Sequence, residues 1–349
     1  MGHLKKDFPP DSPRNKHEKE DCMSEDELTP ESTSESTKKP RVLLTGATGF
    51  LGQRVIRDLA GSYEIIAAHH GGLEPSDNVQ PVHWGASSAS PEALVALSSP
   101  EVLIHLMALA RTEACSQQPE LAHRLNVEVA GRLAHVCCLR GIPMIFTSTD
   151  LVFDGTRGMY VEEDIPVPIN TYARTKWEAE QLLSQKFADQ PHLLTIFRIG
   201  LSYGWGDEAH PGPAGWVLNA LRAGRSVQLF QDEFRSPIYQ GDVSRAISDA
   251  FENKISGLFH LGGPERIDRY ALGVLMAEKF GLDPALIQSG SVTEYQGPEP
   301  RSADCSMDNS LFKKTFGWTP STITEGLDRM ASDAVHNQPE EQICAGANG

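Results

Sequence analysis

The sequence lacks any apolar segment of the roughly 20 residues that a membrane-spanning helix needs. Its first residues include many charged side chains, where a secretory signal peptide would carry an apolar run. Basic residues are also scarce, because 31 Lys and Arg stand against 47 Asp and Glu, for a formal net charge of -16. Nucleic acids and anionic membranes bind basic surfaces, so we expect neither as the main partner and predict a cytoplasmic protein.

The six cysteines form no C-x-x-C motif, and their spacing is not that of a zinc site. Cys137 and Cys138 are adjacent within an apolar stretch of helical character. We therefore predict buried thiols rather than disulfides, and no metal site.

Apolar strands alternate with helices from Arg41 onward. The pattern predicts strands at 42–44, 63–68, 102–108, 144–148 and 256–263, and helices that end at 60 or cover 121–139 and 269–280. Such alternation is typical of a parallel sheet with helices on both faces. We therefore predict an α/β protein with the doubly wound, or Rossmann, fold.

A glycine turn, Gly46-x-x-Gly49-x-x-Gly52, follows the first predicted strand and opens a helix. Glycines at these positions let backbone N–H groups approach a pyrophosphate and let the helix pack closely on the strand. A tight turn without a ligand is the alternative. Because the turn follows the first strand of an α/β pattern, we predict dinucleotide binding.

The type of dinucleotide depends on the end of the second strand, where an acidic residue would bind ribose hydroxyls and repel a 2′-phosphate. The residues there are His69 and His70. No acidic residue excludes NADP(H), and no arginine follows the strand to bind its phosphate, so Arg54 or the histidines would have to help. We predict a slight preference for NADP(H) over NAD(H).

Composition divides the chain into regions. Residues 1–39 contain too few apolar side chains to offset the entropy of ordering, so we predict a disordered tail. Closely spaced glycines and prolines after 203 indicate a smaller, irregular region. We assign an NAD(P)-binding domain to 40–202 with a return segment at 236–262, a substrate-binding region to 203–235 and 263–335, and a flexible C-terminus to 336–349.

Two sets of residues could perform proton chemistry. Thr149 follows a buried strand, at the sheet edge where open α/β proteins bind ligands. Tyr172 and Lys176 stand four residues apart, so both project from one face of a helix. A tyrosine with an ordinary pKa near 10 transfers protons poorly at neutral pH unless a cation lowers that pKa. Alone, each signal fits a turn residue or an exposed helix pair, but their order along the chain favours one catalytic site.

These motifs together resemble the extended short-chain dehydrogenase/reductase superfamily, and within it the dTDP-4-dehydrorhamnose reductases. The resemblance covers about 41–330 and is carried by 46–52, Ser148-Thr149-Asp150 with the Val-Phe-Asp-Gly at 152–155, the Tyr172 and Lys176 pair, 163–172, 235–243 and 300–308. It implies reduction of a sugar ketone, with Tyr172 as proton donor, Thr149 polarising the carbonyl, and Lys176 lowering the Tyr172 pKa and holding the nicotinamide ribose.

The resemblance also implies binding residues. For the cofactor they are Gly46, Thr48, Gly49, Phe50, Leu51, Gly52, His69, His70, Ala108, Tyr172, Lys176 and Arg198. Arg235 and Arg301 are predicted to bind a substrate diphosphate, with a surface salt bridge as the alternative for each. In related dehydratases the catalytic Thr is followed by Asp-Glu, which act as acid and base in the elimination of water. This chain has Leu151 after Asp150, so the base for that elimination is missing.

Two other functions remain open on the same fold. The chain also resembles the regulatory β subunit of methionine adenosyltransferase around 105–119 and 150–176, which implies an NADP-binding protein that acts on a partner enzyme. A nucleotide-sugar epimerase would instead hold NAD⁺ tightly, and the lack of an acidic residue near His69 disfavours it. A nucleotide sugar or related small molecule is the expected substrate, and a homo-oligomer or a partner enzyme the expected assembly.

Overall fold

The computed structural model describes residues 39–85 and 90–336. The predicted tail at 1–39 and the predicted flexible C-terminus at 336–349 therefore lie almost entirely outside the described residues. None of the helices in the described ranges combines the length and apolarity needed to cross a bilayer.

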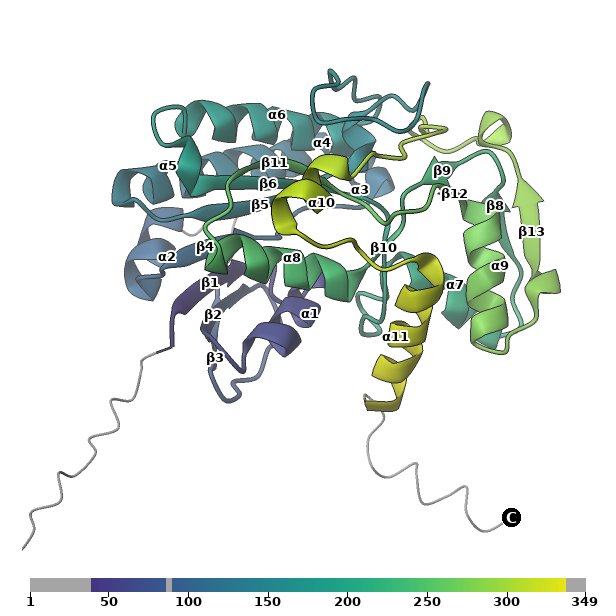
Figure 1. Ribbon diagram of the computed structural model, residues 1–349, viewed down its shortest axis with the longest axis horizontal. Helices are drawn as coiled ribbons and strands as arrows, with labels where there is room; N and C mark the ends of the chain where they lie inside the picture. The colour runs from purple at the N-terminus through teal and green to yellow at the C-terminus, as the bar shows by residue number, and fades with distance from the viewer. Residues whose placement is uncertain (1–38, 86–89, 337–349) are drawn as a thin grey trace, which may run out of the picture. The chain divides into compact units, whose positions relative to one another are not determined.

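Within the described residues, a central sheet has seven strands that are all parallel to their neighbours. Their spatial order is β11 (Gly257–Leu261), β6 (Leu194–Ile199), β5 (Met144–Thr149), β4 (Val102–His105), β1 (Arg41–Thr45), β2 (Glu64–His69) and β3 (Val79–His83). The first strand, β1, lies inside the sheet between β4 and β2. Later strands are added on both sides of it (Figure 1). This confirms the predicted doubly wound α/β fold.

Helices cover both faces because successive strand residues point to opposite sides. In β1, Val42 and Leu44 join one apolar core and Leu43 joins the other. The first core is closed by α1 (Phe50–Leu59) and α8 (Gln240–Glu252). The second is closed by α2 (Pro91–Ser98), α5 (Val129–Arg140) and α6 (Thr171–Lys186).

Two predicted elements are shorter or less regular than the sequence pattern suggested. The strand predicted to reach 108 ends at His105, because the Met107 backbone turns aside to pack against Gly46. The helix predicted at 121–139 is divided into α4 (Pro119–His123), a π-helical turn (Arg124–Glu128) and α5. π-turns of this kind often mark functional sites.

The second region has its own apolar core beside the sheet domain (Figure 1). It is built from α7 (Gly212–Arg222), β8 (Val227–Phe230), α9 (Arg269–Lys279), β13 (Ile287–Gly290) and α11 (Ile323–His336). Short strand pairs join it to the sheet domain, namely β7 (Ser202–Tyr203) with β10 (Ile238–Tyr239) and β9 (Phe234–Arg235) with β12 (Ile267–Asp268). The described ranges also contain the α-helices α3 (Thr112–Gln117) and α10 (Ser310–Phe316).

Candidate active site

The glycine turn forms a cradle that side chains would fill. A Cβ on Gly46 would lie 2.7 Å from the Met107 nitrogen, and one on Gly52 would lie 2.1 Å from the Gly46 oxygen. Gly46 also has a φ of 76°, which favours glycine. Gly49 precedes α1 without a side-chain cap, so the first N–H groups of the helix are available to an anion.

The predicted neighbours of this turn face different surroundings. The Thr48 carbonyl accepts a hydrogen bond from Gln53 Nε2 at 2.8 Å, and Leu51 packs against the first core. The Phe50 ring lies under the loop of the second region, where a Cβ on Gly212 would lie 2.5 Å from it. Phe50 therefore joins the turn to the second region.

The ends of β2 and β3 bring three histidine rings together. The centroids of His69 and His70 each lie 5.9 Å from that of His83, which sequence reasoning did not include. Arg54 lies elsewhere, because its guanidinium bonds Asp58, Tyr239 and Asp333 at 2.6 to 2.7 Å. These contacts engage the Arg54 guanidinium within the protein, and its help in binding a 2′-phosphate stays a prediction.

Thr149 and Tyr172 lie at the carboxyl end of β5. The Thr149 hydroxyl donates to Asp150 Oδ1 at 3.1 Å and accepts from the Leu151 N–H at 3.2 Å. Burial raises the pKa of Tyr172, the charges of Asp150 and Cys115 raise it further, and the Thr149 hydroxyl opposes the rise. Tyr172 therefore keeps its proton at neutral pH, as a proton donor must.

Lys176 lies one helical turn after Tyr172 and is buried. Its Nζ lies 3.9 Å from the centroid of the Phe146 ring. Burial lowers the pKa of Lys176 to about 7, and Glu180 opposes the change. Burial and Lys176 also lower the pKa of His105 to about 3, so this histidine is neutral.

Asn126, which sequence reasoning missed, connects three segments of the site from the π-helical turn. Its side chain accepts from the Leu109 N–H at 2.8 Å, and donates to the Leu109 carbonyl and to Thr175 Oγ1. It thereby fixes the loop that contains Ala108 against the helix of Tyr172 and Lys176. No distinct signal in the sequence marks it, because His123, Arg124 and Glu128 are polar residues of the same helical stretch.

A cavity opens beside these residues, between the end of β5 and the second region. It carries an unusual concentration of charge, on Asp150, Glu233, Arg235, Arg269, Glu299 and Arg301. A second, mainly apolar cavity between α7, β8 and α9 shares Leu201 and Arg269 with the first. Arg269 therefore stands where a polar space and an apolar space meet.

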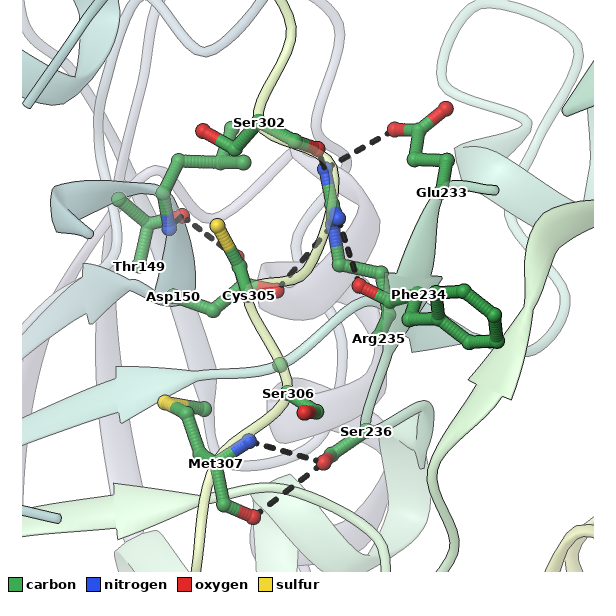
Figure 2. A network of polar contacts seen from close by, with 12 residues as sticks. Thr149, Asp150, Glu233, Phe234, Arg235, Ser236, Ser302, Cys305, Ser306 and Met307 are labelled. Carbon is green, nitrogen blue, oxygen red and sulfur yellow. Dashed lines mark hydrogen bonds and ion pairs between the residues drawn. The ribbon is translucent and has the colours of Figure 1, made fainter. Parts of the chain in front are cut away.

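Glu233 organises the arginines around this cavity, and Figure 2 shows its contact with one of them, Arg235. It is buried and pairs with Arg235 Nη2 at 2.9 Å and with Arg301 Nη2 at 2.9 Å. Burial alone would raise the pKa of Glu233, but Arg235, Arg269 and Arg301 hold it below its ordinary value. Glu233 therefore stays charged.

Arg235 and Arg301, the two predicted diphosphate ligands, differ in how many donors they have left. Arg235 is buried and gives its Nη atoms to Glu233 and to the carbonyls of Phe234 and Ser302. Arg235 also lines the cavity, and its binding of a substrate diphosphate stays a prediction. Arg301 is 28% exposed and can still reach a ligand.

Arg269, at the start of α9, was not predicted. It lines both cavities, and no ion pair holds its guanidinium within the described ranges. Burial and the nearby Arg235 and Arg301 lower its pKa to about 10, although Glu233 opposes them. A cation in this setting is a good site for an anion. Only the assembled fold reveals it, because its neighbours are distant in sequence.

Arg198, predicted to bind the cofactor, is instead 2% exposed inside the sheet domain. Its Nη2 pairs with Glu180 at 2.8 Å, and its Nη1 contacts the His260 ring at 3.3 Å. This ion pair joins β6 to α6 and buries the Arg198 guanidinium, and cofactor binding by Arg198 stays a prediction.

A family model described as the RmlD substrate binding domain matches residues 40–336. The chain belongs to the RmlD substrate binding domain family. This confirms the resemblance to dTDP-4-dehydrorhamnose reductases that its motifs indicated.

The chain is also similar to individual proteins and solved structures. The chain is 30% identical over 289 residues to a probable low-salt glycan biosynthesis reductase, Agl14, of Haloferax volcanii, which covers 81% of the chain and 95% of that protein. It is 28% identical over 281 residues to methionine adenosyltransferase 2 subunit beta of Xenopus laevis. That match covers 78% of the chain and 82% of the Xenopus protein. A crystal structure of a hypothetical dTDP-4-dehydrorhamnose reductase from Sulfolobus tokodaii superposes with a TM-score of 0.68 at 30% identity, over 78% of the chain and 94% of that protein.

Proposed function

We propose that the protein reduces a keto group on a nucleotide-linked sugar, using a nicotinamide dinucleotide. The observation that carries the proposal is the set formed by Thr149, Tyr172 and Lys176 at the end of β5, beside a charged cavity. The named reductase among the relatives supports the same class of reaction.

The glycine cradle fits the pyrophosphate of such a dinucleotide, since Gly46, Gly49 and Gly52 leave the backbone open at the start of α1. When bound, the reduced dinucleotide supplies a hydride to the ketone carbon. His69 and His70 stand at the end of β2, where no carboxylate would repel a 2′-phosphate, so we propose NADP(H) in preference to NAD(H).

Tyr172 acts on the oxygen atom of the ketone C=O bond. As the ketone carbon gains a hydride, the C=O electron pair moves to the oxygen, and the Tyr172 hydroxyl gives that oxygen a proton. Thr149 donates a hydrogen bond to the same oxygen. A protonated Lys176 then stabilises the tyrosinate, and general acid catalysis of this kind contributes roughly 10²–10⁴ in rate.

For the substrate diphosphate we propose Arg301 and Arg269. Arg301 retains exposed surface, and Arg269 faces the cavity without an ion-pair partner in the described ranges. The sugar would then lie between these arginines and Tyr172, with the nucleotide in the second region.

The test follows NADPH and NADH absorbance with purified protein and dTDP-4-keto-6-deoxyhexose, with Tyr172→Phe as the matched variant. Oxidation that depends on the sugar and disappears in Tyr172→Phe is expected. Cofactor binding without oxidation of any keto sugar would contradict the proposal.

A regulatory role is the second candidate, because the chain matches methionine adenosyltransferase 2 subunit beta along 82% of that protein. A regulatory subunit would act through its surface and would keep its effect in Tyr172→Phe. Co-purification with a methionine adenosyltransferase catalytic subunit, and a change in that enzyme's rate, would support this role.

A further inference from the structure

Asp150 is a carboxyl group that the reaction as written above does not use. It follows Thr149 directly, is 4% exposed and lines the charged cavity. Its Oδ1 accepts the Thr149 hydroxyl at 3.1 Å, whereas its Oδ2 has no hydrogen bond among the described residues. Figure 2 shows Asp150 between Thr149 and Arg235.

The Thr149 hydroxyl has one proton to donate and two lone pairs that accept. The Leu151 N–H occupies one lone pair at 3.2 Å. If Asp150 is ionised it can only accept, so it takes the Thr149 proton, and the remaining lone pair repels a ketone oxygen. If Asp150 is protonated it can donate into that lone pair, and the Thr149 proton is then free for the ketone.

Arg235 determines which oxygen of a protonated Asp150 carries the proton. Arg235 Nε lies 3.7 Å from Asp150 Oδ2, and a guanidinium can only donate. The positive charge of Arg235 therefore favours an unprotonated oxygen at Oδ2. The proton is left on Oδ1, the oxygen that contacts Thr149.

We propose that the protonation of Asp150 controls the direction of the Thr149 hydroxyl, which makes Asp150 a positioning residue for carbonyl reduction. This inference rests on the proposed function. The protonated carboxyl allows Thr149 to donate to the substrate, and the carboxylate withdraws that donor.

The surroundings of Asp150 make this control effective near neutral pH. Burial raises the pKa of Asp150 to about 6, against the Arg235 charge and the Thr149 hydroxyl. Groups that face it from other elements are Tyr172, Glu233, Arg235, Arg269 and Cys305. These five keep their ordinary protonation states between pH 5 and 8, so within that range the other relevant titration is that of Lys176, at about 7.

The first experiment compares kcat from pH 5 to pH 8 in wild type, Asp150→Asn and Asp242→Asn. In Asp150→Asn, Arg235 Nε keeps the carbonyl oxygen of the new amide on its side, so the amide N–H₂ donates to Thr149 at every pH. Wild-type kcat should fall from about pH 6, with a logarithmic slope that approaches about -2 as Asp150 and Lys176 both lose protons. The kcat of Asp150→Asn should fall only from about pH 7, with a logarithmic slope of about -1.

Asp242→Asn is the matched control, because Asp242 is equally buried but bonds Ser321 and Arg329 away from Thr149. It should retain the wild-type profile. An Asp150→Asn enzyme that keeps both ionisations, or one that binds cofactor but is inactive at every pH, would overturn the proposal.

A second readout does not need turnover. Carbon-13 NMR of the aspartate carboxyls, assigned with Asp150→Asn, gives the titration midpoint of Asp150. Thr149→Val removes a donor to the carboxylate, so the midpoint should rise, and an unchanged midpoint would overturn the coupling. A raised midpoint in a protein that reduces no keto sugar would support the coupling and overturn the proposed function.

Discussion

Two buried polar clusters lie on either side of Asp150, and they differ in how their charge is balanced. The first surrounds Lys176, whose nearest described contacts include the Phe146 ring. The second surrounds Glu233, which pairs with Arg235 and Arg301. Burial moves the Lys176 pKa to about 7, whereas three arginines keep Glu233 charged.

The difference separates two kinds of chemistry. A buried group with weak pairing changes protonation near neutral pH and suits proton transfer. A buried group with strong pairing keeps its charge and suits a fixed binding wall. Asp150 lies between the two clusters, with a threonine on one side and an arginine on the other.

The largest expected effect is that of Tyr172→Phe in the first cluster. Without the hydroxyl, no proton donor reaches the ketone oxygen, and kcat should fall by roughly 10²–10⁴. Cofactor affinity, measured by fluorescence titration of NADPH, should change little. A variant that retains more than a tenth of the wild-type kcat would show that another group donates the proton.

Glu233→Gln should be the most damaging change in the second cluster. It leaves Arg235 buried without its carboxylate, so the free energy of unfolding should fall by about 3–5 kcal/mol in urea titrations. Because the Glu233 pKa is below its ordinary 4.5, the lost stability is present above that pH and disappears as pH falls through the lowered value. Wild type and variant should therefore converge in acid, and a constant difference would contradict this account.

Two arginine variants in the second cluster should have different effects, because Arg269→Gln should weaken substrate binding and Arg235→Gln should weaken the fold. Loss of a charged hydrogen bond to phosphate costs about 1.5–3 kcal/mol, so Arg269→Gln should raise KM by roughly 10–100-fold with little change in kcat. Arg235→Gln should instead lower stability. If Arg235→Gln raised KM at unchanged stability, the two roles would be reversed.

Lys176→Met should change how the free energy of unfolding depends on pH. The Lys176 pKa of about 7 is below its ordinary 10.5, so between those values the unfolded chain binds more protons and stability rises with pH. This group should add at most about 1.4 kcal/mol per pH unit in that range. The difference between wild type and Lys176→Met, measured by urea titration at pH 7 to 10, isolates the contribution, and a flat difference would contradict the burial of a neutral amine.

Sequence patterns predicted what depends on nearby residues. The strands, the glycine turn and the spacing of Tyr172 and Lys176 follow from local periodicity, and the fold confirms the doubly wound sheet. The roles of Thr149, Tyr172 and Lys176 remain predictions. The pattern of a buried strand at 144–148 also predicted the sheet edge where Asp150 lies.

Contacts between distant residues could not be predicted in this way. Arg198 meets Glu180 from a different element, and Arg235 meets Ser302 across 67 positions, so neither pairing has a local signature. Arg269 differs from these two arginines, because no ion-pair partner holds its guanidinium in the described ranges. This absence of a partner also has no signature in the local sequence. Charges in irregular segments acquire their roles from tertiary structure.

The Arg54 guanidinium has a consequence for how the protein folds. It joins α1, the first helix of the sheet domain, to Tyr239 at the end of β10 and to Asp333 on α11. Helices from opposite ends of the described sequence thus share one partly buried ion network. Because of these shared contacts, we expect opening of α11 to lower the protection of α1 against hydrogen exchange.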